Sequence, residues 1–283
     1  MRLPIQASTP LLDKLTILDD LLADHERVAI AYSGGTDSNF LTWYVKEVLH
    51  KQLVAVLVTT TFLAARELEN ARKMAAVLDL DLEEITVDPL ANPQIRANPT
   101  RRCYFCKQEI MQCVKERARQ RNCSAVLDGT QGDDRKAHRP GRQALEELGI
   151  QSPLAAAGLT KQEIRELSRQ AGLATWNRPS QSCLATRIPY DTPISEARLA
   201  AIDRAEELLQ DLGCQPVRVR VHGQLARIEV DTQCMPVLLR QEVRERVLQR
   251  FRELGFHHTT MDLAGFRSGS WDEQIENHDK TKS

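Results

Sequence analysis

Six consecutive residues, Ser33-Gly34-Gly35-Thr36-Asp37-Ser38, combine glycines with hydroxyl side chains between an apolar run and a stretch with helical spacing. Glycine lets backbone N–H groups come close to an anion. The first turn of a helix adds unpaired N–H groups and a favourable dipole, and Ser33 and Ser38 add hydroxyl donors. The segment therefore predicts a polyphosphate site, and the alternative is a Ser/Gly-rich turn without a ligand. It has neither the Gly-Lys-Ser/Thr of a Walker A loop nor G-x-G-x-x-G.

Further polar residues follow two other predicted strands. Thr59 to Thr61 end the second strand, and Asp128-Gly129-Thr130 with Asp133 and Asp134 end the fourth. Open α/β sheets bind ligands at the carboxyl ends of their strands. The pair Asp133 and Asp134 could therefore contact a metal ion or a substrate, and the alternative is a solvated charged loop.

The chain has seven cysteines, and two of them, Cys103 and Cys106, form a C-x-x-C at the start of a predicted helix. Cys183 lies much later, in a polar and irregular segment. Three interpretations stay open on spacing alone: ligands of an iron–sulfur cluster, half of a zinc site, or a redox or structural pair. The other four cysteines are expected to be small, buried structural side chains: Cys113, Cys123, Cys214 and Cys234.

Short apolar runs alternate with helical patterns through the first 179 residues. This order predicts an α/β fold, a parallel sheet with helices on both faces. The expected strands are 27–32, 53–60, 82–87 and 124–128. The expected helices are 11–23, 37–50, 64–78, 103–121 and 161–171, the last with Thr160 as N-cap and Gly172 as C-cap. The Pro- and Asn-rich segment 88–102 is expected to be a loop.

The segment 176–190 is expected to be irregular, and a different pattern begins near residue 194. A helix over 195–212, strands over 216–221 and 225–230, a helix over 235–254 and a strand over 259–263 predict a small α+β domain. The two strands alternate strictly, which predicts a hairpin with one buried and one wet face. We therefore expect a phosphate-loop domain over 1–179, a second domain over 180–272, and a disordered tail over 273–283.

Composition limits the class of protein. The net charge is −1, from 38 basic and 39 acidic residues, and nucleic-acid-binding proteins usually show a basic excess. The longest apolar run, 53–58, is far shorter than the roughly 20 residues of a membrane span, and the N-terminal region does not resemble a signal peptide. The sequence therefore predicts a cytoplasmic protein without a membrane or nucleic-acid partner.

Several longer segments together resemble the LarE family of ATP-dependent sulfur transferases, which belongs to the PP-loop superfamily of adenine nucleotide α-hydrolases. These segments are SGGTDS (33–38), LDGTQGDD (127–134), RPG (139–141), GIQSPLAAAGLTKQEIREL (149–167), PSQSCLATRIPY (179–190), VRVRVHGQLARIEV (217–230) and MDLAGFRSGS (261–270). The resemblance spans roughly residues 11 to 272. It implies that the PP-loop holds the pyrophosphate leaving group of ATP while AMP passes to the substrate.

The resemblance also implies the reaction. ATP adenylates a carboxylate of pyridinium-3,5-biscarboxylic acid mononucleotide, and a sulfur nucleophile displaces AMP to leave a thiocarboxylate, in nickel-pincer nucleotide biosynthesis. Family members have either one sulfur-donating cysteine or three cysteines that hold a [4Fe–4S] cluster. This chain resembles the second type, with Cys103, Cys106 and Cys183 as cluster ligands. A homo-oligomer, a trimer or hexamer, is expected by the same analogy.

Other roles carry over by motif. Asp37 would help position magnesium, and Lys107 and Arg187 would contact phosphate or carboxylate groups. Arg218 and Arg220 lie on one face of a strand, and the resemblance implies that they contact the substrate phosphate. The alternative for both arginines is an ordinary wet sheet face. Glu206 matches a position linked to activity, although helical glutamates are usually exposed.

Three rival functions remain. PP-loop tRNA thiolases of the 2-thiocytidine type also combine SGGxDS with a C-x-x-C and a later cysteine. An ammonia-using ligase leaves Cys103 and Cys106 without a role. A non-catalytic AMP or redox sensor would bind ATP without releasing pyrophosphate.

Overall fold

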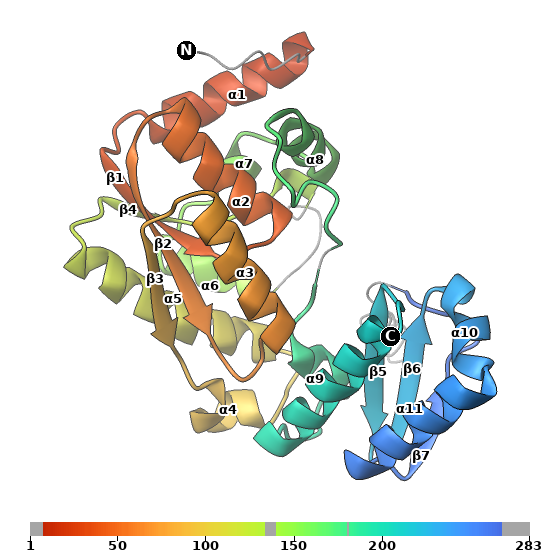
Figure 1. The fold of residues 1–283 in the computed structure, drawn as a ribbon. Helices are drawn as coiled ribbons and strands as arrows, with labels where there is room; N and C mark the ends of the chain where they lie inside the picture. The colour runs from red at the N-terminus through yellow and green to blue at the C-terminus, as the bar shows by residue number, and fades with distance from the viewer. Residues whose placement is uncertain (1–7, 134–139, 180, 268–283) are drawn as a thin grey trace, which may run out of the picture. The chain divides into compact units, whose positions relative to one another are not determined.

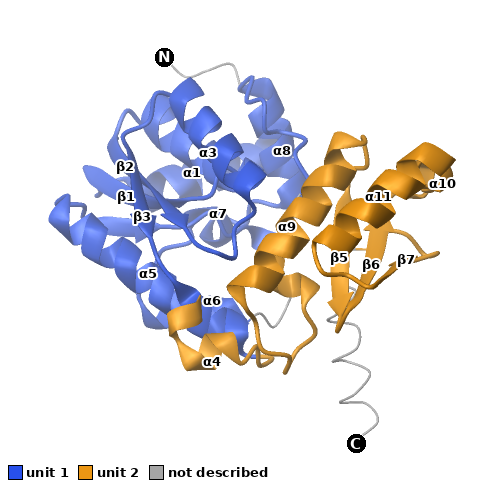
Figure 2. Cartoon of the chain, turned by 60° about the horizontal axis from the view of Figure 1, so that its bottom comes forward, with its two compact units in different colours: residues 1–89, 101–181 blue, residues 90–100, 182–283 orange. Residues whose placement is uncertain are grey.

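The computed structural model describes residues 8–133, 140–179 and 181–267, and these form two compact units. Unit 1 comprises residues 1–89 and 101–181, and unit 2 comprises residues 90–100 and 182–283 (Figure 2). The predicted positions Asp134 and 273–283 lie outside the described residues. Within the described part of the chain, no helix is both long enough and apolar enough to cross a membrane.

The sheet of unit 1 is parallel throughout its described strands, in the order β3-β2-β1-β4. Its strands are β1 (Arg27–Tyr32), β2 (Gln52–Thr59), β3 (Leu82–Thr86) and β4 (Ala125–Leu127). Ile30 of β1 pairs with Ala55 on one side and Leu127 on the other. The phosphate-loop strand therefore lies between β2 and β4, whose polar ends flank it, an order that the sequence did not predict.

Helices cover both faces of this sheet (Figure 1). They are α1 (Thr9–Leu22), α2 (Thr36–Trp43) with the π-helical turn η1 (Tyr44–Val48), α3 (Ala65–Val77), α5 (Arg102–Gln120), α6 (Pro140–Glu147), α7 (Pro153–Ala156) and α8 (Lys161–Gln170). Alternate strand residues divide between two cores. Val28 and Ile30 face the core with α1, α2 and α8, whereas Ala29 faces the core with α5 and α6. This alternation confirms the predicted α/β class.

The caps of α8 also agree with the sequence. Thr160 accepts a hydrogen bond from the Glu163 amide, and the Glu163 carboxylate accepts one from the Thr160 amide, which makes a complete capping box. Gly172 has a left-handed φ of 71° just after the helix. The start of α8 is therefore fixed by local interactions.

Unit 2 has the predicted α+β order. Its elements are α4 (Pro93–Arg96), η4 (Leu184–Arg187), α9 (Glu196–Asp211), β5 (Val217–His222), β6 (Leu225–Val230), η5 (Thr232–Cys234), α10 (Met235–Leu239), α11 (Gln241–Glu253) and β7 (His258–Met261). The sheet order is β5-β6-β7, with β5 and β6 antiparallel and β6 and β7 parallel.

Several predictions for unit 2 are wrong, and the first concerns a helix. The single helix expected over 235–254 is broken at Arg240, which is extended with φ −60° and ψ 136°. Leu238 and Val247 are both buried, yet nine residues put them on opposite sides of a continuous helix, about 180° apart. The break lets both side chains be buried.

The expected wet face of the hairpin is the second error. Arg218, Arg220 and Glu229 are buried, and their face is covered by Phe266 and by the carbonyl group of Thr186 in η4. Alternation along a strand distinguishes its two faces, but it does not show whether other segments cover the polar one.

The segment expected to be a loop, 88–102, also contains short helices. Besides α4, a 3₁₀ turn, η2, spans Pro89–Ala91. Asn92 caps α4 by accepting a hydrogen bond from the Gln94 amide at 2.9 Å. Residues 90–100 belong to unit 2, although the chain on either side of them belongs to unit 1.

Candidate active site

The turn between β1 and α2 requires glycine at position 34. Gly34 has a left-handed φ of 69°, and a Cβ there would lie 2.5 Å from the Cα of Ala71 on α3. The Gly34 carbonyl group accepts a hydrogen bond from the side-chain amide of Asn39 at 2.8 Å. The side-chain oxygen of Asn39 in turn accepts one from the Tyr32 hydroxyl at 2.7 Å. Burial raises the pKa of Tyr32, so this hydroxyl stays a donor. The turn is therefore held closely against α3.

Hydroxyl groups line the turn. The Oγ atoms of Ser33 and Ser38 are 3.1 Å apart, and the Gly35 amide donates to Ser33 Oγ at 3.4 Å. Thr36 and Ser38 are both buried, but the Thr36 hydroxyl donates away from the turn, to the Thr175 carbonyl at 2.7 Å. Ser33 and Ser38 can therefore turn toward an anion, whereas Thr36 anchors the helix start.

The end of β4 lies against the same turn. A Cβ on Gly129 would lie 3.0 Å from the Ser38 amide nitrogen, so glycine permits this close approach. Asp128 is buried, and its carboxylate accepts hydrogen bonds from Ser152 and Thr130, each at 2.6 Å. Gly129 is thus adjacent to the phosphate loop, and Asp128 shapes the segment that follows β4.

Asp37 lies in the first turn of α2 and pairs with Lys161, whose ammonium group lies 2.6 and 2.7 Å from the two carboxylate oxygens. The backbone amide of Lys161 donates to Asp133 at 2.9 Å. Lys161, at the start of α8, therefore links two of the predicted ATP-site residues. Sequence reasoning missed Lys161 because it is separated from the loop by more than a hundred residues.

Two threonines at the end of β2 have buried hydroxyl groups. Among the described residues, neither Thr59 Oγ1 nor Thr61 Oγ1 has a hydrogen-bond partner. Buried polar atoms are nearly always satisfied, so such an atom indicates a site where a ligand or water binds. The hydroxyl groups of Thr59 and Thr61, at the strand end expected near the nucleotide, can therefore hydrogen-bond to a ligand or to water.

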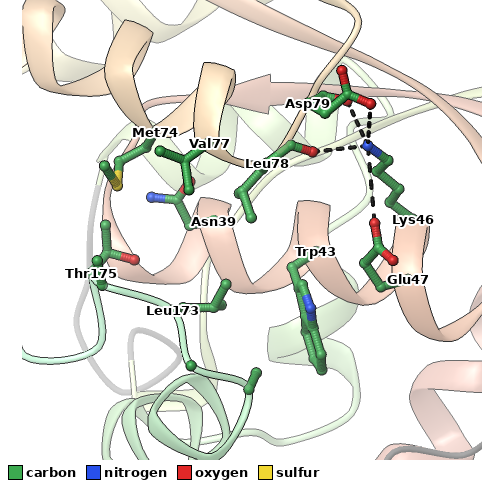
Figure 3. Close-up of a pocket in the computed structure, with 13 residues that line it drawn as sticks. Asn39, Trp43, Lys46, Glu47, Met74, Val77, Leu78, Asp79, Leu173 and Thr175 are labelled. Carbon is green, nitrogen blue, oxygen red and sulfur yellow. Dashed lines mark hydrogen bonds and ion pairs between the residues drawn. The ribbon is translucent and has the colours of Figure 1, made fainter.

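A pocket of about 720 Å³ lies beside α2, with Trp43, Met74 and Leu173 on its walls (Figure 3). No predicted site residue lines it. Lys46 also lines the pocket. Its ammonium group already donates to the carbonyl groups of Leu78 and Asp79 and pairs with the Asp79 carboxylate. The pocket therefore lacks an available cation for a triphosphate, and it touches the loop only through Asn39 and Thr175.

The C-x-x-C lies at the start of α5, in unit 1. Cys103 and Cys106 are three residues apart, so they lie on the same side of the helix, Cys103 exposed and Cys106 partly so. A helix N-terminus favours the thiolate form that metal ions bind. Lys107 is partly exposed one position further along α5. Within either unit, the described residues offer no group of three His, Cys, Asp or Glu side chains placed for a metal ion.

Cys183 belongs to unit 2 and immediately precedes η4. The Arg187 guanidinium group donates to the carbonyl groups of Ser182 and Cys183, at 2.8 and 3.2 Å, and to the hydroxyls of Ser182 and Thr186. Arg187 itself is only 2% exposed. It therefore fixes the backbone on both sides of the Cys183 side chain.

Glu206 of α9 completes this arrangement. It pairs with Arg187 through two hydrogen bonds of 2.8 Å and also accepts the backbone N–H of Val219 on the edge strand β5. Burial alone would lower the pKa of Arg187, but the Glu206 carboxylate outweighs it and the pKa is raised. The expectation that Glu206 is exposed is wrong, because its carboxylate satisfies both a buried guanidinium group and an unpaired strand amide.

Arg218 and Arg220 share one face of β5, as predicted, but they differ in their partners. Arg220 pairs with Glu229 at 3.2 Å. Arg218 lies 4.7 Å from the centre of the Phe266 ring, and its buried Nε has no hydrogen-bond partner among the described residues. Burial, and then repulsion from Arg187 and Arg220, lower the pKa of Arg218 to about 10. Arg218 therefore has a buried positive charge that a bound anion would stabilise.

The remaining cysteines differ from the expectation that all are buried. Cys214 is buried, Cys123 and Cys234 are partly exposed, and Cys113 is exposed on α5. Burial raises the pKa of the Cys214 thiol to about 12, and a hydrogen bond with Cys234 adds to this rise. Cys113 is therefore a surface residue rather than part of the core.

Comparison with known proteins finds one family model and three relatives that match most of this chain. The chain matches a family model described as a family of unknown function (DUF7411) over residues 26–191. It is 37% identical to an uncharacterized protein of Synechocystis sp., over 90% of this chain and 96% of that protein. It is 32% identical to the pyridinium-3,5-bisthiocarboxylic acid mononucleotide synthase of Lactiplantibacillus plantarum, over 90% of this chain and 92% of that protein. The chain belongs to the LarE family. An uncharacterized protein of Methanocaldococcus jannaschii is 30% identical, over 86% of this chain and 92% of that protein.

Membership of the LarE family confirms the resemblance seen in the sequence, and the structure adds residues that the sequence did not single out. Lys161 faces Asp37, Glu229 pairs with Arg220, and Phe266 lies against Arg218. Phe266 and Glu229 both lie within segments that carried the resemblance, MDLAGFRSGS and VRVRVHGQLARIEV. Strand alternation places Glu229 opposite Arg218, which is the one signal that could have found it.

Replacing Gly34 by Ala should destabilise unit 1 by about 2 kcal/mol or more, because the substitution adds a left-handed strain and a clash with Ala71. Denaturant unfolding followed by the fluorescence of the buried Trp43 measures this change. Gly35→Ala is the matched control, since its Cβ meets nothing closer than Ser33 Oγ at 3.4 Å. Equal destabilisation by the two substitutions would contradict the close packing of the turn.

Glu206→Gln should lower the free energy of unfolding of unit 2 by roughly 3 to 5 kcal/mol, because it leaves the Arg187 charge buried without its carboxylate. Glu207→Gln removes the neighbouring, exposed carboxylate of the same helix and should change stability by less than about 0.5 kcal/mol. Urea unfolding followed by circular dichroism compares the two variants. A Glu206→Gln protein as stable as Glu207→Gln would show that the ion pair does not hold the Cys183 loop.

Proposed function

We propose that the protein is an ATP-dependent sulfurtransferase of nickel-pincer nucleotide biosynthesis. It adenylates a carboxylate of pyridinium-3,5-biscarboxylic acid mononucleotide and converts it into a thiocarboxylate. The observation that carries this proposal is the 32% identity, over 90% of the chain, with the pyridinium-3,5-bisthiocarboxylic acid mononucleotide synthase. That relative is named as a synthase, and the compound in its name contains the thiocarboxylate groups that this reaction makes.

The first half-reaction, adenylation of the substrate carboxylate, takes place at the phosphate loop. A substrate carboxylate oxygen attacks the α-phosphorus of ATP, and the bond to the β-phosphate breaks to release pyrophosphate. Ser33, Gly35 and Ser38 donate hydrogen bonds to the leaving pyrophosphate, which is the type of anion that a helix N-terminus stabilises. Magnesium bound near Asp37 would neutralise charge on the phosphates.

Lys161 adds a movable positive charge at this point. In the structure its ammonium group is held by Asp37. The Asp37 carboxylate would hold magnesium in competition with the Lys161 ammonium group, which would then be free to contact the phosphates. Thr59, Gly129, Asp133 and Asp134 would complete the nucleotide site at the carboxyl edge of the sheet.

The second half-reaction needs a sulfur nucleophile that displaces AMP from the acyl adenylate. Cys103, Cys106 and Cys183 are the thiolates that would hold a [4Fe–4S] cluster, whose fourth iron would supply the sulfide. The exposed pair at the start of α5 suits two of these ligands. Arg187 and Glu206 hold the Cys183 backbone, Lys107 would contact a substrate carboxylate or phosphate, and Arg218 and Arg220 would bind the substrate phosphate.

Pyrophosphate release tests the first half. The protein should release pyrophosphate from MgATP only when the biscarboxylic mononucleotide is present, and Lys161→Gln should lower kcat/KM for MgATP by at least about tenfold. The control is Lys73→Gln, which removes a lysine of an exposed pair on α3. ATP binding without pyrophosphate release would instead support a nucleotide sensor, and release that depends on tRNA would support a tRNA thiolase.

Iron content tests the sulfur source. Anaerobically purified protein should contain about four irons and four sulfides per chain, and Cys103→Ser and Cys106→Ser should lose them. Cys113→Ser is the matched control, since Cys113 is an exposed cysteine of the same helix. Absence of iron, with a mass about 34 Da lower after turnover, would show that Cys183 gives up its own sulfur.

A further inference from the structure

A short segment of the chain belongs to unit 2 although it leads directly into the C-x-x-C of unit 1. Residues 90–100 include α4 and group with residues 182–283 (Figure 2). The last residue of this segment, Thr100, precedes Cys103 by three positions. What holds the segment to unit 2 therefore also limits where the first cysteine can lie.

Asn98 is the main anchor of this segment. It is fully buried, and its side-chain amide donates to the carbonyl groups of Pro189 at 2.7 Å and Ile188 at 3.4 Å. The backbone carbonyl group of Asn98 accepts a hydrogen bond from the Asp191 backbone amide at 2.9 Å. Two residues earlier, the backbone carbonyl group of Arg96 accepts one from the Ile194 amide. Asn98 has a left-handed φ of 59°, a conformation that asparagine tolerates better than most residues.

The partners of Asn98 continue the loop that carries Cys183. Ile188 directly follows Arg187, which hydrogen-bonds the Cys183 carbonyl, so one short stretch of chain is held from both ends. Five residues separate Asn98 from Cys103, and a chain of that length reaches at most about 18 Å. Whatever the arrangement of the two units, Cys103 stays within this distance of a residue fixed on the Cys183 loop.

We propose that Asn98 is a positioning residue, which anchors the segment entering the C-x-x-C to the loop carrying Cys183 and so keeps these thiols within reach of one another. The proposal deepens the proposed function, because it concerns how the ligands of the sulfur-supplying site come together. The anchor acts through the chain and makes no contact with substrate. Without its side-chain hydrogen bonds, residues 90–100 would be held to unit 2 less firmly, and the thiols would meet less often.

The test measures the effective concentration of Cys103 relative to Cys183 in the cluster-free, full-length protein. Cys106, Cys113, Cys123 and Cys234 are replaced by Ser, and the buried Cys214 is kept. In a glutathione redox buffer, the two thiols lose two electrons and two protons to oxidised glutathione, which forms one protein disulfide and two molecules of glutathione. Peptide mapping of the Cys103–Cys183 disulfide at several buffer ratios gives the effective concentration.

Asn98→Asp, which keeps the shape but loses the amide donor, should lower this concentration about tenfold. Asn98→Gly, which keeps the left-handed backbone, should do the same, and it decides the test if the Asp variant does not fold. The control is Asn122→Asp, an exposed asparagine with φ 54° at the end of α5, which should leave the value unchanged. An unchanged value in folded Asn98 variants would overturn the proposal.

Iron content separates this proposal from the proposed function. With all cysteines present, the Asn98 variants should retain less iron after anaerobic reconstitution than the Asn122→Asp protein does. If the unsubstituted protein binds no iron but the disulfide still depends on Asn98, the cluster is wrong and the anchor stands. If iron binds equally well in Asn98 and Asn122 variants, the anchor is wrong and the cluster stands.

Discussion

The buried pair between Arg187 and Glu206 is the interaction on which the second unit depends. A guanidinium group that is 2% exposed is tolerable only because a carboxylate meets it through two hydrogen bonds. The same carboxylate accepts the amide of Val219, so one side chain joins a helix, an edge strand and the loop around Cys183. Local order near the cysteine is therefore inseparable from the packing of α9 on β5.

In unit 1, the corresponding constraint is steric. The phosphate loop lies so close to α3 that a Cβ on Gly34 would lie 2.5 Å from the Cα of Ala71, and Gly129 brings the end of β4 against the Ser38 amide. One glycine after β1 and one after β4 thus let three segments converge at the phosphate loop. A site for a polyphosphate needs such an approach, because water between the segments would screen the donors.

The sequence predicted the four strands and five of the helices of unit 1 because these carried local signals, whereas α6 and α7 were not predicted. Apolar runs marked the strands, and Thr160 and Gly172 marked the ends of one helix. Interactions between distant residues left no such signal: Lys161 meets Asp37 across 124 positions, and Asn98 meets Pro189 across 91. The hairpin was misjudged for the same reason, since burial of Arg220 depends on a carbonyl group from η4 that strand alternation does not reveal. Site residues were thus predictable as members of motifs, but their partners were not.

Charge is unevenly paired around the small sheet of unit 2. Around β5 and β6, the described residues place four guanidinium groups, of Arg187, Arg218, Arg220 and Arg227, beside three carboxylates, of Glu206, Glu229 and Asp262. Four against three leaves one positive charge in excess. Burial lowers the pKa of both Arg218 and Arg220, but Arg220 pairs with Glu229, whereas the buried Nε of Arg218 has no hydrogen-bond partner among the described residues. A fold under selection for stability alone would have an apolar side chain there, because replacing a poorly paired buried charge is often stabilising. An anion that binds the Arg218 guanidinium group in the folded protein would offset the free-energy cost of removing that group from water. The unpartnered Nε of Arg218 therefore supports the proposal that this face of the small sheet binds a negatively charged ligand.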